Sequence, residues 1–213
     1  ITFHEFICAC FFLEASRNVV DVNILESGLF FRLDASNVLT ENIASVIMPI
    51  GMDHKDFLKE GTIDEIVYEK CSHLLGDSKI IISKQKNTTL EKIKKNLISN
   101  SSQKLFYGED FSCTKNENNF FYKDSYGEMN LPLPNLQGDF QINNVTTAIA
   151  TIRSLNQFKI NELEISKAIT KIRSEGRLQN IMHGKLKNLV SKNNQIIIDG
   201  AHNTLAAIEI KKY

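Results

Sequence analysis

The sequence predicts an α/β protein with a mostly parallel sheet flanked by helices and a small antiparallel appendage. Residues 19–25 and 43–50 are apolar runs rich in Val and Ile without polar alternation. Such runs are typical of strands buried on both faces of a parallel sheet. The first run stops at Glu26 and the second leads to Asp53 and His54. Because ligands bind beyond the carboxyl ends of parallel strands, we expect Glu26 and His54 to share one site.

The composition bounds the class of protein. The 213 residues are 42% hydrophobic and 23% charged, which is ordinary for a globular chain. The chain has 25 basic residues (Lys plus Arg) and 25 acidic residues (Asp plus Glu). It therefore has no excess positive charge that would attract nucleic acid or an anionic membrane. No apolar run reaches the roughly 18 to 20 residues of a membrane span. The four cysteines form no CxxC pair, which predicts free thiols in the reducing cytoplasm.

A helix is expected from residue 3 to about Asn18. Thr2 and Glu5 have the spacing of a capping box. Apolar residues follow at helical spacing, so this helix should pack on the sheet. On these residues alone, capping is the favoured role of Thr2 and Glu5, and ligand binding is the alternative.

Residues 28–37 should form a loop, because Gly, Asp, Ser and Asn cluster there without periodicity. Arg32 and Asp34 in this loop have the chemistry to bind a polar heterocycle. The alternative is a surface ion pair between them, which would contribute little to stability.

The second strand leads into a βαβ unit. Residues 62–65 have the spacing of a second capping box, and the helix that they open should end near Gly76. Residues 80–82 supply the next strand, so the crossover should be right-handed. A helix at 90–98 and a short strand at 104–107 follow.

The residue composition changes after residue 109. Residues 110–130 are polar with interspersed aromatics, which predicts short antiparallel strands. Stacking of these aromatics on nucleic acid is the alternative, and the balanced charge disfavours it. Residues 131–134 should be extended because of their two prolines. Helices are expected at 141–154 and 161–172.

A domain boundary is expected between residues 1–173 and 174–213. In the second part, residues 195–198 should form a buried strand that ends at Asp199, and a helix should follow. One strand and one helix cannot bury a core of their own, so this domain is expected to be truncated.

Short motifs along the chain carry a family resemblance. In order, they are Leu25-Glu26-Ser27-Gly28-Leu29, Arg32-Leu33-Asp34-Ala35-Ser36-Asn37, Ile50-Gly51-Met52-Asp53-His54, Glu69-Lys70, Leu131-Pro132-Leu133-Pro134, Gly138 with Gln141 and Asn144, Gly176-Arg177, and Asp199-Gly200-Ala201-His202-Asn203. Each motif is weak alone, but their shared order is specific. Together they resemble the folylpolyglutamate synthase and dihydrofolate synthase family of the Mur ligase superfamily.

The resemblance implies the central ATPase domain of a Mur ligase followed by the start of a Rossmann-like domain. It also implies ATP-dependent ligation of glutamate to folate or dihydropteroate through an acyl phosphate, with Mg²⁺. No GxxxxGK[ST] phosphate loop occurs in the 213 residues. We therefore expect little or no activity from the isolated chain, and a separate chain is a candidate source of that loop.

The resemblance also assigns roles to the polar motifs. Glu26 and His54 resemble the magnesium ligands, and the carboxylate suits this ion better than the imidazole. Lys70 is similar to the lysine that the family carbamylates, a reaction that needs a neutral amine. Lys70 and His54 are the expected catalytic residues. On the residues alone, His54 reads as a histidine bonded to backbone, and Lys70 as a surface lysine beside Glu69.

The ligand contacts follow from the same resemblance. Asn144, Arg177 and Asp199 resemble ATP contacts, whereas His202 and Asn203 should shape the turn into the last helix. The residues that resemble the pterin-binding segments are Thr2, Phe3, His4, Glu5, Arg32, Leu33, Asp34 and Ala35.

The chain departs from the family pattern in three places. Phe30 and Phe31 replace two glycines, His4 replaces an aromatic residue, and Cys71-Ser72 replaces Ala-Gly. The alternatives to a folate ligase are a non-catalytic remnant or half of a split ligase, a metal-binding module, and a murein-type ligase.

Overall fold

The computed structural model describes residues 1–213 as two compact units, and each is described by itself. The first unit comprises Ile1–Ile50, His54–Ile80 and Gln85–Gln103, and the second comprises Gly51–Asp53, Ile81–Lys84 and Lys104–Tyr213. The expected boundary at residue 174 is a different division and stays a prediction.

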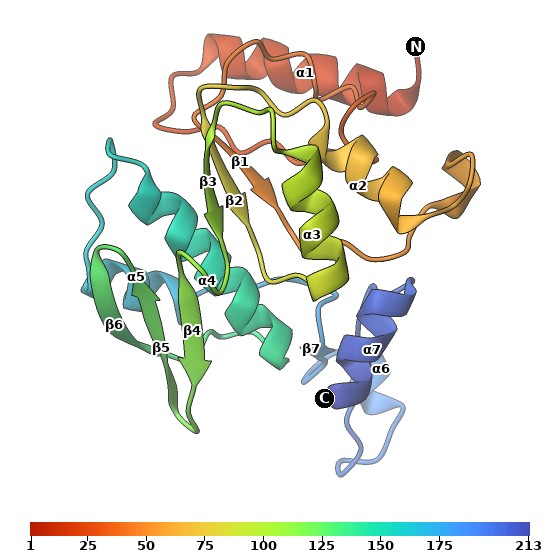
Figure 1. The fold of residues 1–213 in the computed structure, drawn as a ribbon. Helices are drawn as coiled ribbons and strands as arrows, with labels where there is room; N and C mark the ends of the chain where they lie inside the picture. Colours follow the sequence, from red (N-terminus) through yellow and green to blue (C-terminus); the bar gives the residue numbers. More distant parts are fainter. The chain divides into compact units, whose positions relative to one another are not determined.

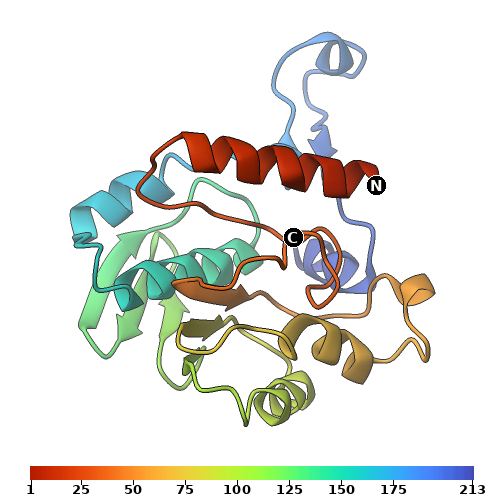
Figure 2. The same ribbon diagram turned by 90° about the horizontal axis from the view of Figure 1, so that it is seen from above.

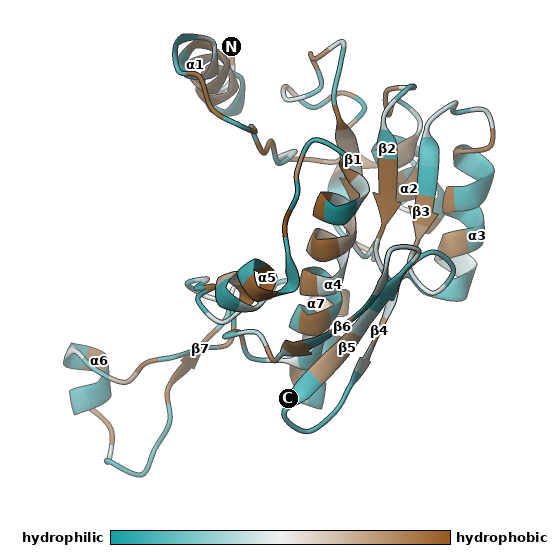
Figure 3. Ribbon diagram, turned by 90° about the vertical axis from the view of Figure 1, so that its left-hand side faces the viewer, coloured by the Kyte–Doolittle hydropathy of each residue, from teal (hydrophilic) through white to brown (hydrophobic).

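A three-stranded parallel sheet confirms the α/β class (Figure 1). Its strands are β1 (Ala44–Ile47), β2 (Lys79–Ile82) and β3 (Gln103–Phe106), in the order β1-β2-β3. The helices α2 (Ile63–Cys71) and α3 (Asn87–Asn96) connect them and pack on each other. Figure 3 shows β2 as strongly hydrophobic, which agrees with the complete burial of Ile80, Ile81 and Ile82.

Both predicted capping boxes of the first unit are present. α1 (Phe3–Arg17) begins where the Thr2 hydroxyl accepts from Glu5 N and the Glu5 carboxylate accepts from Thr2 N. α2 begins in the same way at Thr62. It ends at Cys71, with Ser72 as its C-cap, so the predicted end near Gly76 was wrong. The left-handed conformation that often follows a helix is found at Asp77, not at the glycine.

The strand predicted at residues 19–25 is wrong. This segment has no regular secondary structure, and none of the sheets includes it. A strand exists only where a neighbouring strand pairs with its backbone, and an apolar run does not report that pairing. α1 also buries only Cys8, so the predicted packing of its apolar face is not observed. The exposed apolar residues of these two segments include Phe3, Phe6, Ile7, Leu13, Val19, Val20, Val22 and Ile24.

The second unit contains the predicted antiparallel appendage. Its strands β4 (Ser112–Lys115), β5 (Asn119–Asp124) and β6 (Gly127–Pro132) form a meander. α4 (Asp139–Ser154) packs on β4 and β5, as Figure 2 shows, and α5 (Glu162–Ile169) packs on β6. The core of this part includes Phe120, Tyr122, Leu131, Val145 and Ile149.

Short elements complete the second unit. β7 (Gln179–Asn180) pairs antiparallel with β8 (Ile197–Ile198). The sequence predicted β8 as a buried strand, but both of its residues are exposed and its two-residue partner was not predicted. α6 (Lys185–Asn188) lies between them in the chain, and α7 (Thr204–Lys212) follows as predicted. In the first unit, the 3₁₀ helix η1 (Lys55–Phe57) was not predicted.

None of the helices combines the length and the apolar character that crossing a membrane requires.

Candidate functional site

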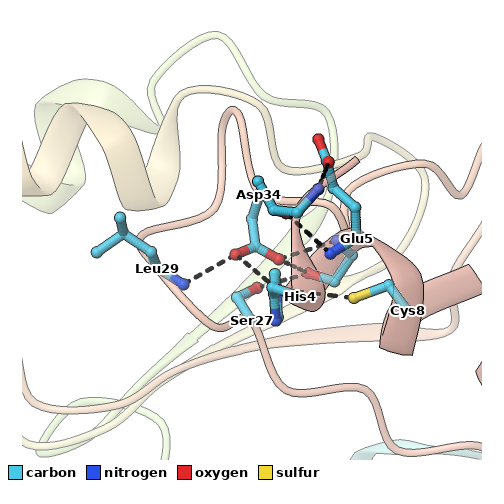
Figure 4. A network of polar contacts seen from close by, with 8 residues as sticks. His4, Glu5, Cys8, Ser27, Leu29 and Asp34 are labelled. Atoms are coloured by element: carbon cyan, nitrogen blue, oxygen red, sulfur yellow. Dashed lines mark hydrogen bonds and ion pairs between the residues drawn. The ribbon is translucent and has the colours of Figure 1, made fainter.

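Asp34 is the centre of a polar network in the first unit (Figure 4). Its Oδ2 accepts from Leu29 N at 2.8 Å, and its Oδ1 accepts from the Ser36 amide and hydroxyl at 2.9 and 2.5 Å. Burial raises the pKa of the Asp34 carboxyl, but the hydrogen bonds from Ser36 and Leu29 outweigh it and leave the pKa below its usual value. Asp34 is therefore a buried anion at neutral pH.

His4 reaches this network from α1. Its Nε2 lies 3.5 Å from Asp34 Oδ2 and 3.6 Å from Cys8 Sγ. A Cβ on Gly28 would lie 2.5 Å from His4 Cε1, so the ring rests against the Gly28 backbone. The structure thus brings together the two segments that the sequence assigned to pterin binding, 30 residues apart in the chain. Their binding role stays a prediction.

Arg32 pairs with Glu69 on α2, not with Asp34. Its Nε donates to both carboxylate oxygens at 3.0 Å, and its Nη2 donates to Oε1 at 2.8 Å. The guanidinium also lies 5.6 Å from the centre of the Tyr68 ring. The predicted alternative of an Arg32–Asp34 surface pair was therefore wrong, because a bidentate partner on α2 holds the arginine. Glu69 directly precedes Lys70, so this pair ties the loop to the segment that carries the predicted catalytic lysine.

Phe30 lies next to both predicted catalytic residues. Lys70 Nζ is 5.9 Å from the centre of the Phe30 ring, and the His54 ring is 6.1 Å from it on an edge-to-face approach. Phe30 and His54 have φ values of 55° and 49°, the left-handed conformation that glycine adopts most readily. Phe30 thus adopts a backbone conformation that glycine favours, and its ring lies near Lys70 and His54.

The metal site stays a prediction. Glu26 and His54 are both exposed. No group of three or more His, Cys, Asp or Glu side chains in the chain is arranged to hold a metal ion. A Mg²⁺ ion at Glu26 and His54 would need further ligands besides these two side chains, because Mg²⁺ prefers octahedral coordination by oxygen.

Arg177 and Asp199 lie on adjoining segments of the second unit. Asp199 Oδ2 accepts from Leu178 N at 2.7 Å, and Gly200 N donates to Gly176 O at 2.8 Å. A Cβ on Gly200 would lie 2.6 Å from Arg177 Nη1, so the guanidinium covers that glycine. The structure therefore brings these two predicted ATP contacts together.

Asn144, the third predicted ATP contact, lies on α4. Its Nδ2 donates to Gln141 Oε1 at 3.0 Å. No described contact joins it to the other two predicted residues, and its role stays a prediction.

Asp53 was missed as a functional candidate. Its Oδ2 accepts from Asn203 Nδ2 at 2.8 Å and lies 3.9 Å from His202 Nε2. Asn203 also caps α7 by accepting from Ala206 N, which confirms its predicted turn-shaping role. The position of Asp53 beside His54 in the same motif was a signal that could have found it.

A cavity of about 380 Å³ in the second unit was also not predicted. The first turn of α4 and the end of α7 line it, and its charged residues are Lys115, Asp139, Glu209 and Lys212. The lining comes from β4, from residues 133–138, from α4 and from α7, so no single motif signalled it.

The molecule is thus an α/β protein with polar, motif-bearing loops around its parallel sheet. No protein-family model matches the chain. A dihydrofolate synthase/folylpolyglutamate synthase of Buchnera aphidicola subsp. Acyrthosiphon pisum is 30% identical over 226 residues, covering the whole chain and 47% of that protein. A dihydrofolate synthetase of Saccharomyces cerevisiae is 30% identical over 200 residues, covering 89% of the chain and 44% of that protein. A solved FPGS-AMPPCP-folate complex matches the whole chain and 51% of its own, with a TM-score of 0.84 and 25% identity.

The whole length of the chain is therefore homologous to one part of the proteins of the dihydrofolate synthase and folylpolyglutamate synthase family, as its motifs predicted. It spans about half the length of the curated relatives that it matches.

Proposed function

We propose that this chain forms part of an ATP-dependent ligase that adds glutamate to folate or dihydropteroate through an acyl phosphate. The observation that carries the proposal is the match of the chain, over its whole length in one relative and over 89% in another, to proteins named for these two activities. The matching solved complex is named for AMPPCP, an ATP analogue, and folate. The polar networks of both units supply chemistry that suits these ligands.

The acceptor would bind where α1 meets the loop at residues 28–37. Asp34 is a buried anion there, and an ionised carboxylate accepts strongly from the amino and ring N–H groups of a pterin. Arg32 closes the same loop through its pair with Glu69. The residues that we assign to acceptor binding are Thr2, Phe3, Glu5, Arg32, Leu33, Asp34 and Ala35, and His4 lies at this site beside Asp34.

The nucleotide would bind through Arg177, Asp199 and Asn144. Arg177 is exposed and donates one described hydrogen bond, at 3.4 Å to Gly176 O, and its planar guanidinium suits phosphate oxygens. Each Asp199 oxygen accepts a backbone amide, from Leu178 and Ala201. A carboxylate has about four acceptor positions, so Asp199 retains capacity for ribose hydroxyls.

Glu26 and His54 are the residues that we assign to holding Mg²⁺, and water and ligand oxygens would fill the remaining positions of the ion. The alternative of a metal-binding module is disfavoured because no cluster of three ligands is present. Lys70 is the proposed site of carbamylation, with its amine over the Phe30 ring. Carbamylation would turn this cation into an anion near the Phe30 ring.

The proposal includes a phosphate-binding loop on a further stretch of polypeptide, in the same or a separate chain. The 213 residues contain no GxxxxGK[ST] motif. Backbone amides and the lysine of such a loop hold nucleotide phosphates. We therefore expect this chain to bind ligands and to show little ligation by itself.

Thermal unfolding with and without ligands tests the proposal, because a ligand that binds the native state raises the melting temperature by mass action. We expect folic acid and MgATP each to raise it. D34N should abolish the folic acid shift only, and R177A should abolish the MgATP shift only. H73F, at an exposed histidine two residues after the end of α2, is the control and should preserve both shifts.

Two results would contradict the proposal. One is the absence of any shift with either ligand at millimolar concentration. The other is loss of both shifts in each single variant, which would indicate general destabilisation. ATP-dependent incorporation of labelled glutamate by the chain alone would overturn the expectation of little activity.

A further inference from the structure

The acceptor capacity of Asp34 is almost fully used by its own loop. An ionised carboxylate offers about four acceptor positions. Leu29 N, Ser36 N and the Ser36 hydroxyl occupy three of them. One position, on Oδ2, is left for any other donor.

His4 stands at that remaining position. Its Nε2 is 3.5 Å from Oδ2, and the ring is wedged between the Asp34 carboxylate and the Gly28 backbone. The Asp34 side chain is only 2% exposed, whereas the His4 side chain is 48% exposed. The imidazole is therefore the part of this network that faces solvent and that an incoming ligand would meet.

The contacts that hold the His4 ring are weak. The distance of 3.5 Å to Asp34 Oδ2 is at the long limit for a hydrogen bond, and the partner at 3.6 Å is the Cys8 thiol, which is a weak donor and a weak acceptor. The capping box of α1 uses Thr2 and Glu5, so rotation of the His4 side chain would leave the start of the helix intact.

We propose that His4 determines which acceptors bind, because it covers the one acceptor position of Asp34 that the loop leaves. A heterocycle with an amino group can donate a hydrogen bond to Asp34 only after it displaces the His4 imidazole. This inference rests on the proposed function, which makes Asp34 the partner of a pterin ring. In this role His4 competes with the ligand for Asp34, so removing the imidazole should raise the affinity for the ligand. If His4 instead supported the loop, removing it should lower that affinity.

Calorimetric titration of the 213-residue chain with folic acid tests the inference, with 4-aminobenzoylglutamate as a second probe that lacks the pterin. We expect H4A to bind folic acid roughly three- to tenfold more tightly than the unaltered chain, the effect of one competing hydrogen bond. H4Q, which keeps a donor at this position, should bind like the unaltered chain. Neither variant should change the affinity for 4-aminobenzoylglutamate.

Amide exchange at Leu29 checks that the loop persists, because this amide donates to the same Asp34 oxygen. It should remain protected in H4A, and faster exchange would overturn the inference by showing that the ring supports the loop. Equal or weaker binding of folic acid by H4A would also overturn it, and the proposed function would stand. Folic acid binding to neither protein would refute the proposed function, and the inference with it.

Discussion

Neutralising Asp124 should strongly destabilise the second unit. Arg153 on α4 donates to both Asp124 oxygens at 2.7 and 3.0 Å, and these side chains are only 16% and 8% exposed. The same carboxylate accepts from the Tyr122 hydroxyl and from Tyr126 N. D124N leaves the Arg153 charge buried without a counter-ion, and removing one partner of a buried pair costs about 3 to 5 kcal/mol. We expect the lower end, about 3 kcal/mol, because the amide retains one acceptor oxygen.

Urea denaturation followed by circular dichroism measures this loss in the free energy of unfolding. E128Q is the matched control, since Glu128 forms an exposed pair with Lys123 on neighbouring strands and its neutralisation should have no measurable effect. A loss below about 1 kcal/mol in D124N, or an equal loss in E128Q, would refute the reasoning.

The same pair predicts a pH dependence. Burial raises the pKa of Asp124, but the hydrogen bonds from Arg153 and Tyr122 outweigh it, so the pKa is net lowered. A lowered pKa means that the stabilisation is present above the usual carboxyl pKa of about 3.9 and is lost as the pH falls through the folded value. The stability difference between the unaltered chain and D124N should therefore be constant near neutrality and shrink below about pH 4.

Three further measurements follow from local geometry. Burial raises the pKa of the Cys71 thiol to about 12, so iodoacetamide at neutral pH should modify exposed Cys10 in the native protein and spare Cys71; equal labelling by mass spectrometry would count against this. G138A should lower the melting temperature, because Gly138 has a φ of 93° and a Cβ there would lie 2.5 Å from Phe140 Cε1; an unchanged value would show that the turn adapts. T62A should cost about 1 kcal/mol of unfolding free energy by removing the cap of α2, whereas T62S should preserve it, and equal stability of the two would contradict the capping role.

Local chemistry was predictable from the sequence. The capping boxes at Thr2 and Thr62 formed as expected because the interacting groups are three residues apart and need no tertiary partner. The βαβ unit was predictable for a similar reason, since the buried run at residues 80–82 and the helical spacing before it agree.

Pairing and long-range contacts were less predictable. Residues 19–25 have the composition of a strand, but composition does not specify a neighbour to pair with. The motifs assigned His4 and Asp34 to related segments. They did not predict that the two side chains approach to 3.5 Å, which is possible because Gly28 has no side chain beside the His4 ring. Likewise, the sequence could not show that Arg32 turns to Glu69.

At Phe30 and His54, the stability of the backbone conflicts with the presence of a side chain. Both residues carry side chains in a backbone conformation that costs of order 1 to 3 kcal/mol each. Replacing Phe30 by glycine would relieve that strain and also remove the ring that contacts Lys70 and His54. Selection for stability would favour glycine at position 30, whereas selection for the aromatic ring would favour phenylalanine. The residue at this position in close relatives should therefore show which of the two was selected.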